Sequence, residues 1–506
     1  MNIVIVGGGT VGWLTALYAK KIYNEHNVVL IESEEYGILG AGEGSTPQLI
    51  TILNFLEIPY TDLIKNCQST IKNGIKFTNW SNKNYFHPFF SDNIASNDYN
   101  FGLKNFYLEN DISFAHFCAS LEDHNLKDYS LMEQASDLML VPFTKNNVNQ
   151  TTNQIALVSL HFDAKLLANY LKKVGKERGI VTKEGTINAI FNNEEGYVNK
   201  LKTEKEEIDC DFVFDCSGFK KLIIGNHYKS NWKSHSEHLP TKKAIPFFLK
   251  MDKEIPPYTE AIAMDYGWMW KIPLQHRYGC GYVFDSDYIS DEDAIKEIEK
   301  YLGFEPEYPR KEKGAFNFSA GCFEEIWIKN CLSVGLSSGF IEPLEATSIM
   351  QAILVLQRFM SDKQNLNTKN NLIKKRFNDI YLNETQEVVD FLYLHYVTNK
   401  KNTSFWKDFT KKNKMPEKIS YILNVCNEKP LVNTFDLFDN VIFNSFSYYY
   451  ILIGNEIINK KEMKKMSNTI LDDLKKQDYK FILNAQKALI PKLLTHNNYI
   501  DIIKNN

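Results

Sequence analysis

The stretch Val4-Ile-Val-Gly7-Gly8-Gly9-Thr10-Val11-Gly12-Trp13, close to the start of the chain, decides the fold. It predicts a buried strand over Ile3–Val6, a glycine-rich turn and a helix over Trp13–Lys21, followed by a second strand over Val28–Ile31. In the pattern Gly-x-Gly-x-x-Gly, the first glycine permits the tight turn and the second lets a pyrophosphate approach the backbone. The third lets helix and strand pack closely, and the unpaired amides at the helix start would face the phosphates.

An acidic residue completes this pattern. Glu32 stands 20 residues after Gly12, at the end of the second predicted strand. A carboxylate at this place in a βαβ unit binds ribose hydroxyls, so strand, turn, helix and acid together predict a dinucleotide site. FAD is favoured over NAD, because the nucleotide-binding core resumes only much later, with a strand over Phe212–Asp215 that runs into Ser217-Gly218.

The composition of the 506 residues excludes several classes of protein. With 58 basic and 62 acidic residues the net charge is −4, whereas a general nucleic-acid binder would be basic. No apolar run reaches the roughly 18 residues of a membrane span, and no secretory signal precedes the first strand. We therefore expect a soluble cytoplasmic protein without nucleic-acid or membrane partners. Whether it forms a homo-oligomer is left open.

Two further counts bear on the kind of site. The 8 cysteines and 11 histidines show no zinc-type spacing, so no metal site is expected. Only 5 of the 58 basic residues are arginines, so an anion site in this chain would rely on backbone amides or on lysine.

Several motifs farther along the chain point to one family. Residues 268–273 read Trp268-Met-Trp270-Lys-Ile-Pro273. The accompanying motifs are Gly42-Glu43-Gly44-Ser-Thr-Pro47, Gly74-Ile-Lys76-Phe-Thr-Asn-Trp80, His161-Phe-Asp163 and Gly335-Leu336-Ser-Ser-Gly-Phe-Ile-Glu342-Pro-Leu-Glu345-Ala-Thr347-Ser348. Together they resemble the tryptophan halogenase family of flavin-dependent halogenases along the whole chain, most closely over residues 1–350.

Trp268 and Trp270 lie two residues apart, so in a strand they share one face. An aromatic pair in a strand is by itself more typical of core packing, but the flanking Ile-Pro favours a functional role. The resemblance implies that the two indoles separate the flavin from the organic substrate.

Lys76 lies in an apolar–polar alternation that turns its ammonium away from Ile75 and Phe77. A lysine in such a pattern is ordinarily a surface residue. The resemblance implies instead that Lys76 is catalytic: it receives hypohalous acid and, by hydrogen bonding or as a haloamine, holds the halogen beside the substrate ring. Glu345 is the second implied catalytic residue, which polarises the hypohalous acid or helps to remove the ring proton.

The resemblance also implies the remaining contacts. Halide would lie at the backbone amides of Thr347 and Ser348. Because Ala346 and Ser348 replace the serine and glycine of the best-known family motif, the halide preference stays open. His87 and Phe89 would line the arene pocket with Trp268 and Trp270, although His87 also fits a satisfied core histidine, and His161-Phe-Asp163 fits packing or indirect cofactor support. The implied FAD contacts are Gly7, Gly8, Gly9, Thr10, Val11, Gly12, Glu32, Ser33, Glu43, Gly44, Leu336 and Ile349.

The predicted architecture is α/β (α+β): an FAD-binding Rossmann-like core of the flavin monooxygenase type, an inserted β-rich substrate lobe and a helical C-terminal region. β-type runs occur at Ala244–Leu249 and Gly279–Val283, and helical spacing occurs at Phe162–Lys176, Ile349–Met360, Ile380–Tyr396 and Ile470–Leu494. The predicted segments are 1–84 and 156–225 (core), 85–155 and 226–320 (substrate lobe), 321–360 (return to the core with FAD and halide contacts) and 361–506 (helical substrate cover).

We therefore expect a flavin-dependent halogenase. Reduced FAD, O2 and halide would make hypohalous acid for electrophilic halogenation of an indole or phenol, and a separate flavin reductase would supply the reduced FAD. An FAD-dependent aromatic monooxygenase and a flavin-binding protein without turnover are the two alternatives. The sequence does not indicate the substrate, the ring position or the halide.

Overall fold

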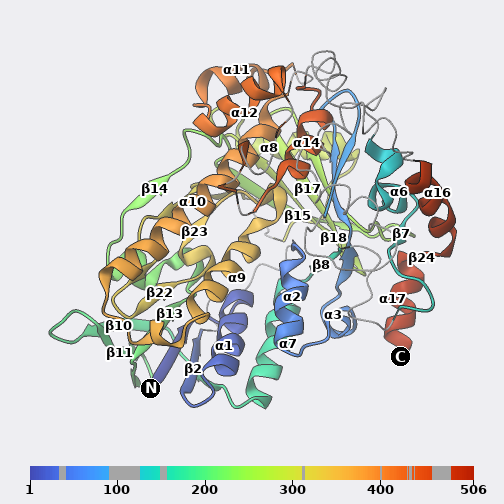
Figure 1. The fold of residues 1–506 in the computed structure, drawn as a ribbon. Coiled ribbons are helices and arrows are strands. Elements are labelled where there is room, and N and C mark those ends of the chain that lie inside the picture. The colour runs from blue at the N-terminus through green and yellow to red at the C-terminus, as the bar shows by residue number, and fades with distance from the viewer. Residues whose placement is uncertain are drawn as a thin grey trace. The chain divides into compact units, whose positions relative to one another are not determined.

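The computed structural model describes residues 1–33, 42–89, 126–148, 157–309, 314–398, 402–429, 431, 436–437, 439–440, 442–458 and 480–506. The chain forms two compact units, and the predicted mixed α/β fold is confirmed (Figure 1). The first unit comprises residues 1–69, 162–236 and 318–386, and the second comprises 70–161, 237–317 and 387–506. No helix within the described ranges is long and apolar enough to cross a membrane.

The first unit is built on a six-stranded sheet with the order β21-β22-β13-β1-β2-β9. All of its neighbouring strands pair in parallel except β21 with β22. The central strands are continuous apolar runs, which is typical of parallel sheets buried on both faces. The strands are β1 (Asn2–Val6), β2 (Asn27–Glu32), β9 (Val181–Glu184), β13 (Phe212–Asp215), β21 (Trp327–Ile328) and β22 (Cys331–Ser333).

Helices and two small sheets complete the first unit. The helices α1 (Thr10–Ile22), α2 (Gln48–Phe55), α3 (Tyr60–Asn66), α7 (Ala164–Glu177) and α9 (Thr347–Met360) pack against one another, with α1 in contact with both α7 and α9. The predicted βαβ start, the strand over 212–215 and the helices near 162–176 and 349–360 are confirmed. The small sheets are β10 (Ile187–Asn192), β11 (Val198–Thr203) and β12 (Glu207–Asp209), and β14 (Trp232–Ser234), β20 (Gly321–Phe323) and β23 (Gly339–Phe340).

The second unit is built on a seven-stranded sheet with the order β19-β15-β18-β17-β16-β5-β6. Its neighbours are antiparallel except β16 with β5, and β15 and β18 contain the two predicted β-type runs. The strands are β5 (Gly74–Thr78), β6 (Tyr85–Pro88), β15 (Lys243–Lys250), β16 (Thr259–Ala263), β17 (Gly267–Pro273), β18 (Arg277–Phe284) and β19 (Phe316–Asn317).

The two faces of this sheet differ. On one, here called the α8 face, Met269 and Tyr282 form a buried core with Ala294 and Ile298 of α8 (Asp291–Leu302). On the other, here called the tryptophan face, the predicted pair Trp268 and Trp270 is found. Because side chains alternate along a strand, the strand register assigns each residue of the sheet to one of these faces.

The remaining elements of the second unit are short strands and helices. β4 (Thr70–Lys72) pairs with β8 (Ser159–Phe162), and β7 (Leu140–Val141) pairs with β24 (Leu494–Thr495). The helices are α6 (Leu131–Asp137), α11 (Ser404–Lys412), α12 (Glu417–Glu428), α14 (Ser445–Gly454), α16 (Lys480–Leu489) and α17 (His496–Asn505). The long helix α10 (Asn371–Tyr396) contains the predicted helix over 380–396, and its residues from Glu387 onward belong to this unit.

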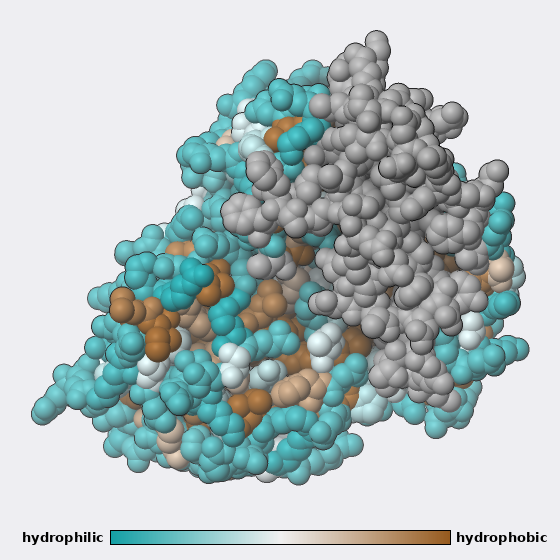
Figure 2. Space-filling model, viewed as in Figure 1, coloured by the Kyte–Doolittle hydropathy of each residue, from teal (hydrophilic) through white to brown (hydrophobic). Residues whose placement is uncertain are grey.

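Two predictions fall partly outside the described residues. Of the proposed lobe 85–155, the structure describes 85–89 and 126–148, and of the proposed helix 470–494 it describes the part from 480 onward. On the face drawn in Figure 2, the described surface is mainly hydrophilic, with hydrophobic residues in small groups.

Candidate active site

The glycine-rich turn connects β1 to α1 in the first unit, and its glycines have distinct surroundings. Gly7 has a φ of +118°, in the region that favours glycine. A Cβ at Gly12 would lie 1.9 Å from the carbonyl oxygen of Gly7, so the turn and the helix touch there. A Cβ at Gly9, in contrast, would have no atom within 4 Å. The space beside Gly9 therefore admits an anionic group to the amides at the start of α1.

Glu32 lies against this turn. A Cβ at Gly8 would lie 2.3 Å from Glu32 Oε2, so the absence of a side chain at Gly8 lets the carboxylate approach. The other carboxylate oxygen of Glu32 forms an ion pair with Lys172 Nζ at 2.5 Å, which holds the acid in place at the end of β2. The turn and the acid are thus brought together as the sequence predicts.

The carboxyl ends of the parallel strands meet at one edge of the sheet, where the chain leaves β1 for β2 on one side and β13 lies on the other. Such a switch point is where open α/β sheets bind ligands. A cavity of about 500 Å³ opens at this edge beside Glu32. It is lined by Ser33, Glu184, Gly185, Thr186, Asn188, Glu204 and Lys205. Its polar walls and its place after β2 and β9 suit the nucleoside end of a dinucleotide.

At the same edge of the six-stranded sheet, the strand β13 leads into a turn that is held by hydrogen bonds. The Asp215 carboxylate, fully buried, accepts hydrogen bonds from the amides of Ile223 (2.8 Å) and Ile224 (3.1 Å) and from the Ser217 hydroxyl (2.6 Å). Burial raises the pKa of Asp215, and these hydrogen bonds oppose that rise. The carboxylate thus fixes the path of Ser217-Gly218 next to the glycine-rich turn.

The predicted contacts from the 335–349 segment lie in the same unit. The Cβ position of Gly335 is 3.0 Å from Val11 Cγ1, so the turn that carries Leu336 packs against the start of α1. Ile349 is buried in the first turn of α9.

Glu43 and Gly44, also predicted as cofactor contacts, form the short strand β3 (Glu43–Gly44). Burial, with repulsion from Asp163, raises the pKa of Glu43 to about 7.

The start of α9 offers an anion site of the predicted kind. Ala346 has a φ of +55° and the helix begins at Thr347, so the amides of Thr347 and Ser348 belong to the first turn, which has no intrahelical acceptors. Thr347 is 1% exposed, and no partner for its buried hydroxyl is found among the described residues. Two amides and a hydroxyl are therefore available to an anion. Glu345, which directly precedes this turn, is 5% exposed.

In the second unit, Trp268 and Trp270 share the tryptophan face with ring centroids 6.2 Å apart, as the spacing predicts. Trp268 is buried and Trp270 half-buried. The Trp270 ring lies over Gly281 of β18, where a Cβ would be 2.1 Å from the ring. Gly281 thus leaves the room that this indole occupies.

His87 lies on the tryptophan face too, because it pairs with Ile75 on the neighbouring strand β5 and Ile75 pairs with Thr259. Its ring is 5.7 Å from Phe391 of α10 and 6.4 Å from Tyr450 of α14. Helices α10 and α14 therefore supply the aromatic contacts of His87.

Lys76 lies on the opposite face. It pairs with Glu260 of β16, which in turn pairs with Lys271 of β17, so all three point to the α8 side. The ammonium of Lys76 donates to Asp137 Oδ1 at 3.2 Å and lies 5.3 Å from the ring of Tyr258. Its side chain is 26% exposed. The alternation expected from the sequence is confirmed, and it turns Lys76 away from His87.

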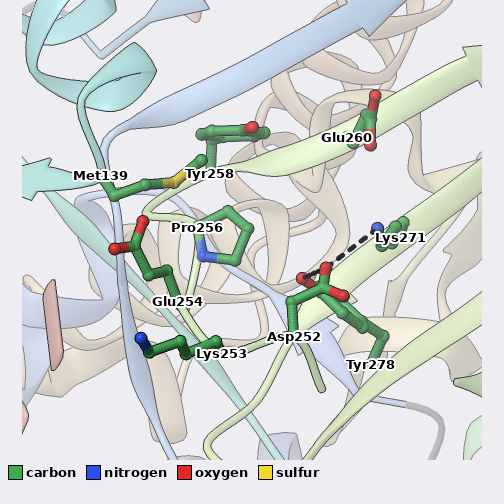
Figure 3. A pocket seen from close by; sticks show the side chains of 9 residues that line it. All are labelled: Met139, Asp252, Lys253, Glu254, Pro256, Tyr258, Glu260, Lys271 and Tyr278. Carbon is green, nitrogen blue, oxygen red and sulfur yellow. Dashed lines mark hydrogen bonds and ion pairs between the residues drawn. The ribbon is translucent and has the colours of Figure 1, made fainter. Parts of the chain in front are cut away.

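A cavity of about 400 Å³ lies on that same side of the sheet (Figure 3). Figure 3 shows Asp252 between Lys271 and Tyr278, and the Tyr278 hydroxyl donates to Asp252 at 2.7 Å. The lining residues are Met139, Asp252, Lys253, Glu254, Pro256, Tyr258, Glu260, Lys271 and Tyr278. Three carboxylates and two lysines make this cavity unsuited to an uncharged aromatic ring.

A different lysine lies beside the predicted arene-lining residues. Lys72, at the end of β4, is 0% exposed, and its Nζ is 5.2 Å from the centre of the Phe89 ring. The amide of Phe89 donates to the carbonyl of Asn73 at 3.3 Å, which holds the two chain segments side by side. A fully buried lysine is rare in proteins. The sequence motifs did not single out Lys72, although it lies between the apolar Ile71 and the motif that begins at Gly74.

Comparison with known proteins shows the family to which the chain belongs. A sequence model of the family described as tryptophan halogenase matches residues 2–469. The chain belongs to the tryptophan halogenase family. It is 30% identical to tryptophan 6-halogenase SttH of Streptomyces toxytricini over 83% of this chain and 82% of that protein, and 28% identical to tryptophan 7-halogenase RebH of Lentzea aerocolonigenes over 90% and 89%.

Solved structures agree with this assignment. The crystal structure of SttH superposes with a TM-score of 0.85 at 27% identity, covering 99% of both chains. BrvH, a flavin-dependent halogenase from Brevundimonas sp. BAL3, superposes with a TM-score of 0.80 at 26% identity, again covering 99% of both chains. The predicted fold and enzyme class are thus confirmed: this member of the tryptophan halogenase family is a flavin-dependent halogenase.

The predicted site residues divide between the units. The dinucleotide and anion elements belong to the first unit, and the tryptophan pair, His87, Phe89 and both lysines belong to the second. Phe391 and Tyr450 were not predicted; the run Tyr448-Tyr-Tyr450 in an apolar helix was the one signal for the latter. Among the described residues, no group of three or more His, Cys, Asp or Glu side chains is placed to hold a metal ion.

Proposed function

We propose that the enzyme halogenates an electron-rich aromatic compound, an indole or a phenol, with Lys72 rather than Lys76 as the lysine that receives the halogen. The observation that carries the choice of lysine is the burial of Lys72 against Phe89. Lys76 is partly exposed, paired with Asp137, and lies on the other face of the sheet from His87. Indoles are the first class to test, because the named relatives are tryptophan halogenases.

FAD is the cofactor that the first unit suits. Gly9 leaves room for the pyrophosphate at the start of α1, Glu32 is held by Lys172 within reach of a ribose, and the cavity beside Ser33 accepts the nucleoside end. Reduced FAD, when bound, would supply two of the four electrons that reduce O2, and the halide and arene supply the other two, so that an arene C–H, a halide ion, a proton, O2 and FADH2 give an aryl halide, FAD and two molecules of water. A separate flavin reductase supplies the reduced cofactor.

The anion site of α9 is assigned to the halide. The amides of Thr347 and Ser348 and the buried Thr347 hydroxyl donate to it, and the positive end of the helix dipole favours a negative charge. No arginine is required, which agrees with the scarcity of arginine in the chain.

Lys72 and Glu345 handle the halogen and the proton. The Lys72 ammonium donates a hydrogen bond to hypohalous acid and keeps it next to Phe89, where the substrate ring is held. The O–halogen bond breaks as the halogen bonds to a ring carbon, and the leaving hydroxide takes the hydrogen-bonded proton of Lys72 and departs as water. The Glu345 carboxylate takes up the proton that the ring carbon loses. Trp268, Trp270 and His87 shape the aromatic side of the site.

A lysine comparison tests the proposal. Lys72→Ala and Lys76→Ala enzymes are assayed with FAD, a flavin reductase and bromide on a panel of indoles and phenols, and products are weighed by mass spectrometry. We expect Lys72→Ala to lose halogenation by at least about 100-fold with FAD affinity unchanged, and Lys76→Ala to keep most of it. The reverse pattern would restore Lys76 as the relay.

The same assay separates the alternative functions. Brominated product that requires bromide supports halogenation, whereas a product heavier by one oxygen and independent of halide would identify an aromatic monooxygenase. The absence of any product from the panel, despite bound reduced FAD, would point to a flavoprotein without turnover.

A further inference from the structure

A chain of buried hydrogen bonds crosses the second unit through His161. This histidine of β8 is 0% exposed and lies between two threonines: its Nδ1 is 3.0 Å from the Thr70 hydroxyl and its Nε2 is 2.9 Å from the Thr259 hydroxyl. The Thr70 hydroxyl also lies 2.7 Å from the carbonyl oxygen of Pro273. Four groups from four strands, β16, β8, β4 and β17, are thus linked in series.

The donors and acceptors of this chain have one consistent order. The carbonyl oxygen of Pro273 can only accept, so the Thr70 hydroxyl donates its single hydrogen to that oxygen. The oxygen of Thr70 must then accept from His161 Nδ1–H, which leaves Nε2 as the acceptor for the Thr259 hydroxyl. A protonated imidazole would instead donate from Nε2 to the Thr259 oxygen and reverse the direction of that bond.

The surroundings favour the same neutral ring. Burial, followed by the charge of Lys72, holds the pKa of His161 well below its ordinary value. His496 itself is neutral in this setting: its Nε2 accepts from the amide of Ile71 at 2.8 Å, and burial lowers its pKa to about 4. The chain through His161 is therefore intact throughout the neutral pH range.

Two members of this hydrogen-bonded series, Thr70 and Pro273, lie on the strands that carry the proposed halogenation residues. Thr70 lies on β4 two residues before Lys72, and Pro273 ends the strand that carries Trp268 and Trp270. β4 pairs with β8 instead of joining the seven-stranded sheet formed by the described strands. Asn73 alone connects Lys72 to Gly74, the first residue of β5, and we expect the side-chain contacts of β4 to set its direction.

The geometry assigns His161 the role of a positioning residue that holds the Lys72 strand against β16 through Thr70 and Thr259, and so fixes the Thr70 hydroxyl that donates to Pro273 at the end of the tryptophan strand. This inference rests on the proposed function of Lys72 and deepens it. Because a displacement of about 1 Å can lower the rate of an oriented reaction about 100-fold, loosening β4 harms the transfer of halogen to the arene. It leaves the FAD and halide elements of the first unit untouched, so hypohalous acid is still made and escapes unused.

The test compares the amount of bromine transferred to the indole with the amount that leaves the enzyme as hypobromous acid. Thr70→Val keeps the shape of the side chain but removes the hydroxyl, and His161→Gln loses the donor to Thr70. Each holoenzyme is assayed with FAD, a flavin reductase, bromide and an indole that the natural enzyme accepts. Brominated indole is quantified by mass spectrometry, and escaped hypobromous acid is trapped with monochlorodimedone. We expect the ratio of product to escaped acid to fall about 10-fold or more in both variants.

Matched variants separate positioning from stability. Thr70→Ser keeps the hydroxyl and His161→Asn keeps a donor near the Nδ1 position, so both should retain more of the ratio than Thr70→Val and His161→Gln. The double variant of Thr70→Val and His161→Gln should be no worse than the worse single variant, since both cut the same chain. His235→Gln removes another buried histidine, in the first unit, and should lower the melting temperature with the ratio unchanged.

Three results would overturn the inference. One is an unchanged ratio in Thr70→Val and His161→Gln, whatever their melting temperatures. Another is a ratio that falls equally in His235→Gln, and the last is additive loss in the double variant. If Lys72→Ala halogenates normally, the proposed relay itself fails, whereas a dead Lys72→Ala beside normal Thr70 and His161 variants rejects only the positioning role.

Discussion

The glycine-rich turn allows a sharp test, because Gly9 and Gly12 share a motif but differ in their surroundings. At Gly12 a Cβ would lie 1.9 Å from the Gly7 carbonyl oxygen, so alanine forces the turn to move by about 1 Å. Overpacking of this kind costs about 2–4 kcal/mol of unfolding free energy. At Gly9 the Cβ position is open, and the backbone, with φ −75° and ψ −178°, suits any residue.

Alanine at Gly9 should therefore leave the apoprotein within about 1 kcal/mol of the natural stability, since lower chain entropy in the unfolded state and a poorer helix cap roughly offset each other. The new methyl group would instead occupy the space reserved for the pyrophosphate. We expect FAD affinity to fall at least 10-fold, or about 1.4 kcal/mol. Gly12→Ala should lose both stability and affinity.

Urea unfolding of the FAD-free proteins gives the first quantity, and titration of FAD fluorescence gives the second. Each variant controls for the other, because the side chain added is the same. Natural FAD affinity in Gly9→Ala would refute the assignment of that space to the cofactor. Natural stability in Gly12→Ala would refute the packing argument.

Three other outcomes follow from the structure. Thr347→Val should raise the KM for bromide about 10-fold, because a hydrogen bond to an anion is lost, while stability holds or rises; an unchanged halide dependence contradicts the anion site. Burial raises the pKa of Glu133 to about 7, so the folded state binds its proton more tightly than the unfolded one and stability falls as pH rises from about 4.5 to 7. Glu133→Gln should thus gain up to about 3 kcal/mol over the natural protein at pH 8 and little at pH 4.5 in urea unfolding; an equal gain at both values speaks against it. Gly281→Ala should push against the Trp270 ring, where the Cβ would be 2.1 Å away, and shift tryptophan fluorescence with a loss of about 1–3 kcal/mol; an unaltered emission spectrum and melting temperature would count against this packing.

The local patterns of the sequence were sufficient for the dinucleotide elements. Hydrophobic runs and glycine spacing predicted β1, α1 and β2 to within three residues at their boundaries, and Glu32 lies against the turn as expected. The tryptophan pair was equally accessible, since alternation along a strand requires Trp268 and Trp270 to share a face.

The choice between Lys72 and Lys76 shows what local sequence patterns cannot predict. Alternation placed Lys76 away from Ile75 and Phe77, and the structure agrees. It could not say which face of the strand would meet the aromatic residues, because that depends on β6 and β16, which pair with β5 from other parts of the chain. The same limit hid Phe391 and Tyr450, whose approach to His87 depends on how distant helices pack.

By itself the sequence determined the family, the glycine-rich turn with its acid and the helix that begins near Thr347, because each of these is made by residues close together in the chain. Only the tertiary structure decided that Lys72 is the buried lysine beside Phe89, and that His161 joins its strand to β16 through Thr70 and Thr259. Burial and hydrogen-bond partners between strands arise from contacts across long sequence separations, and no local periodicity encodes them.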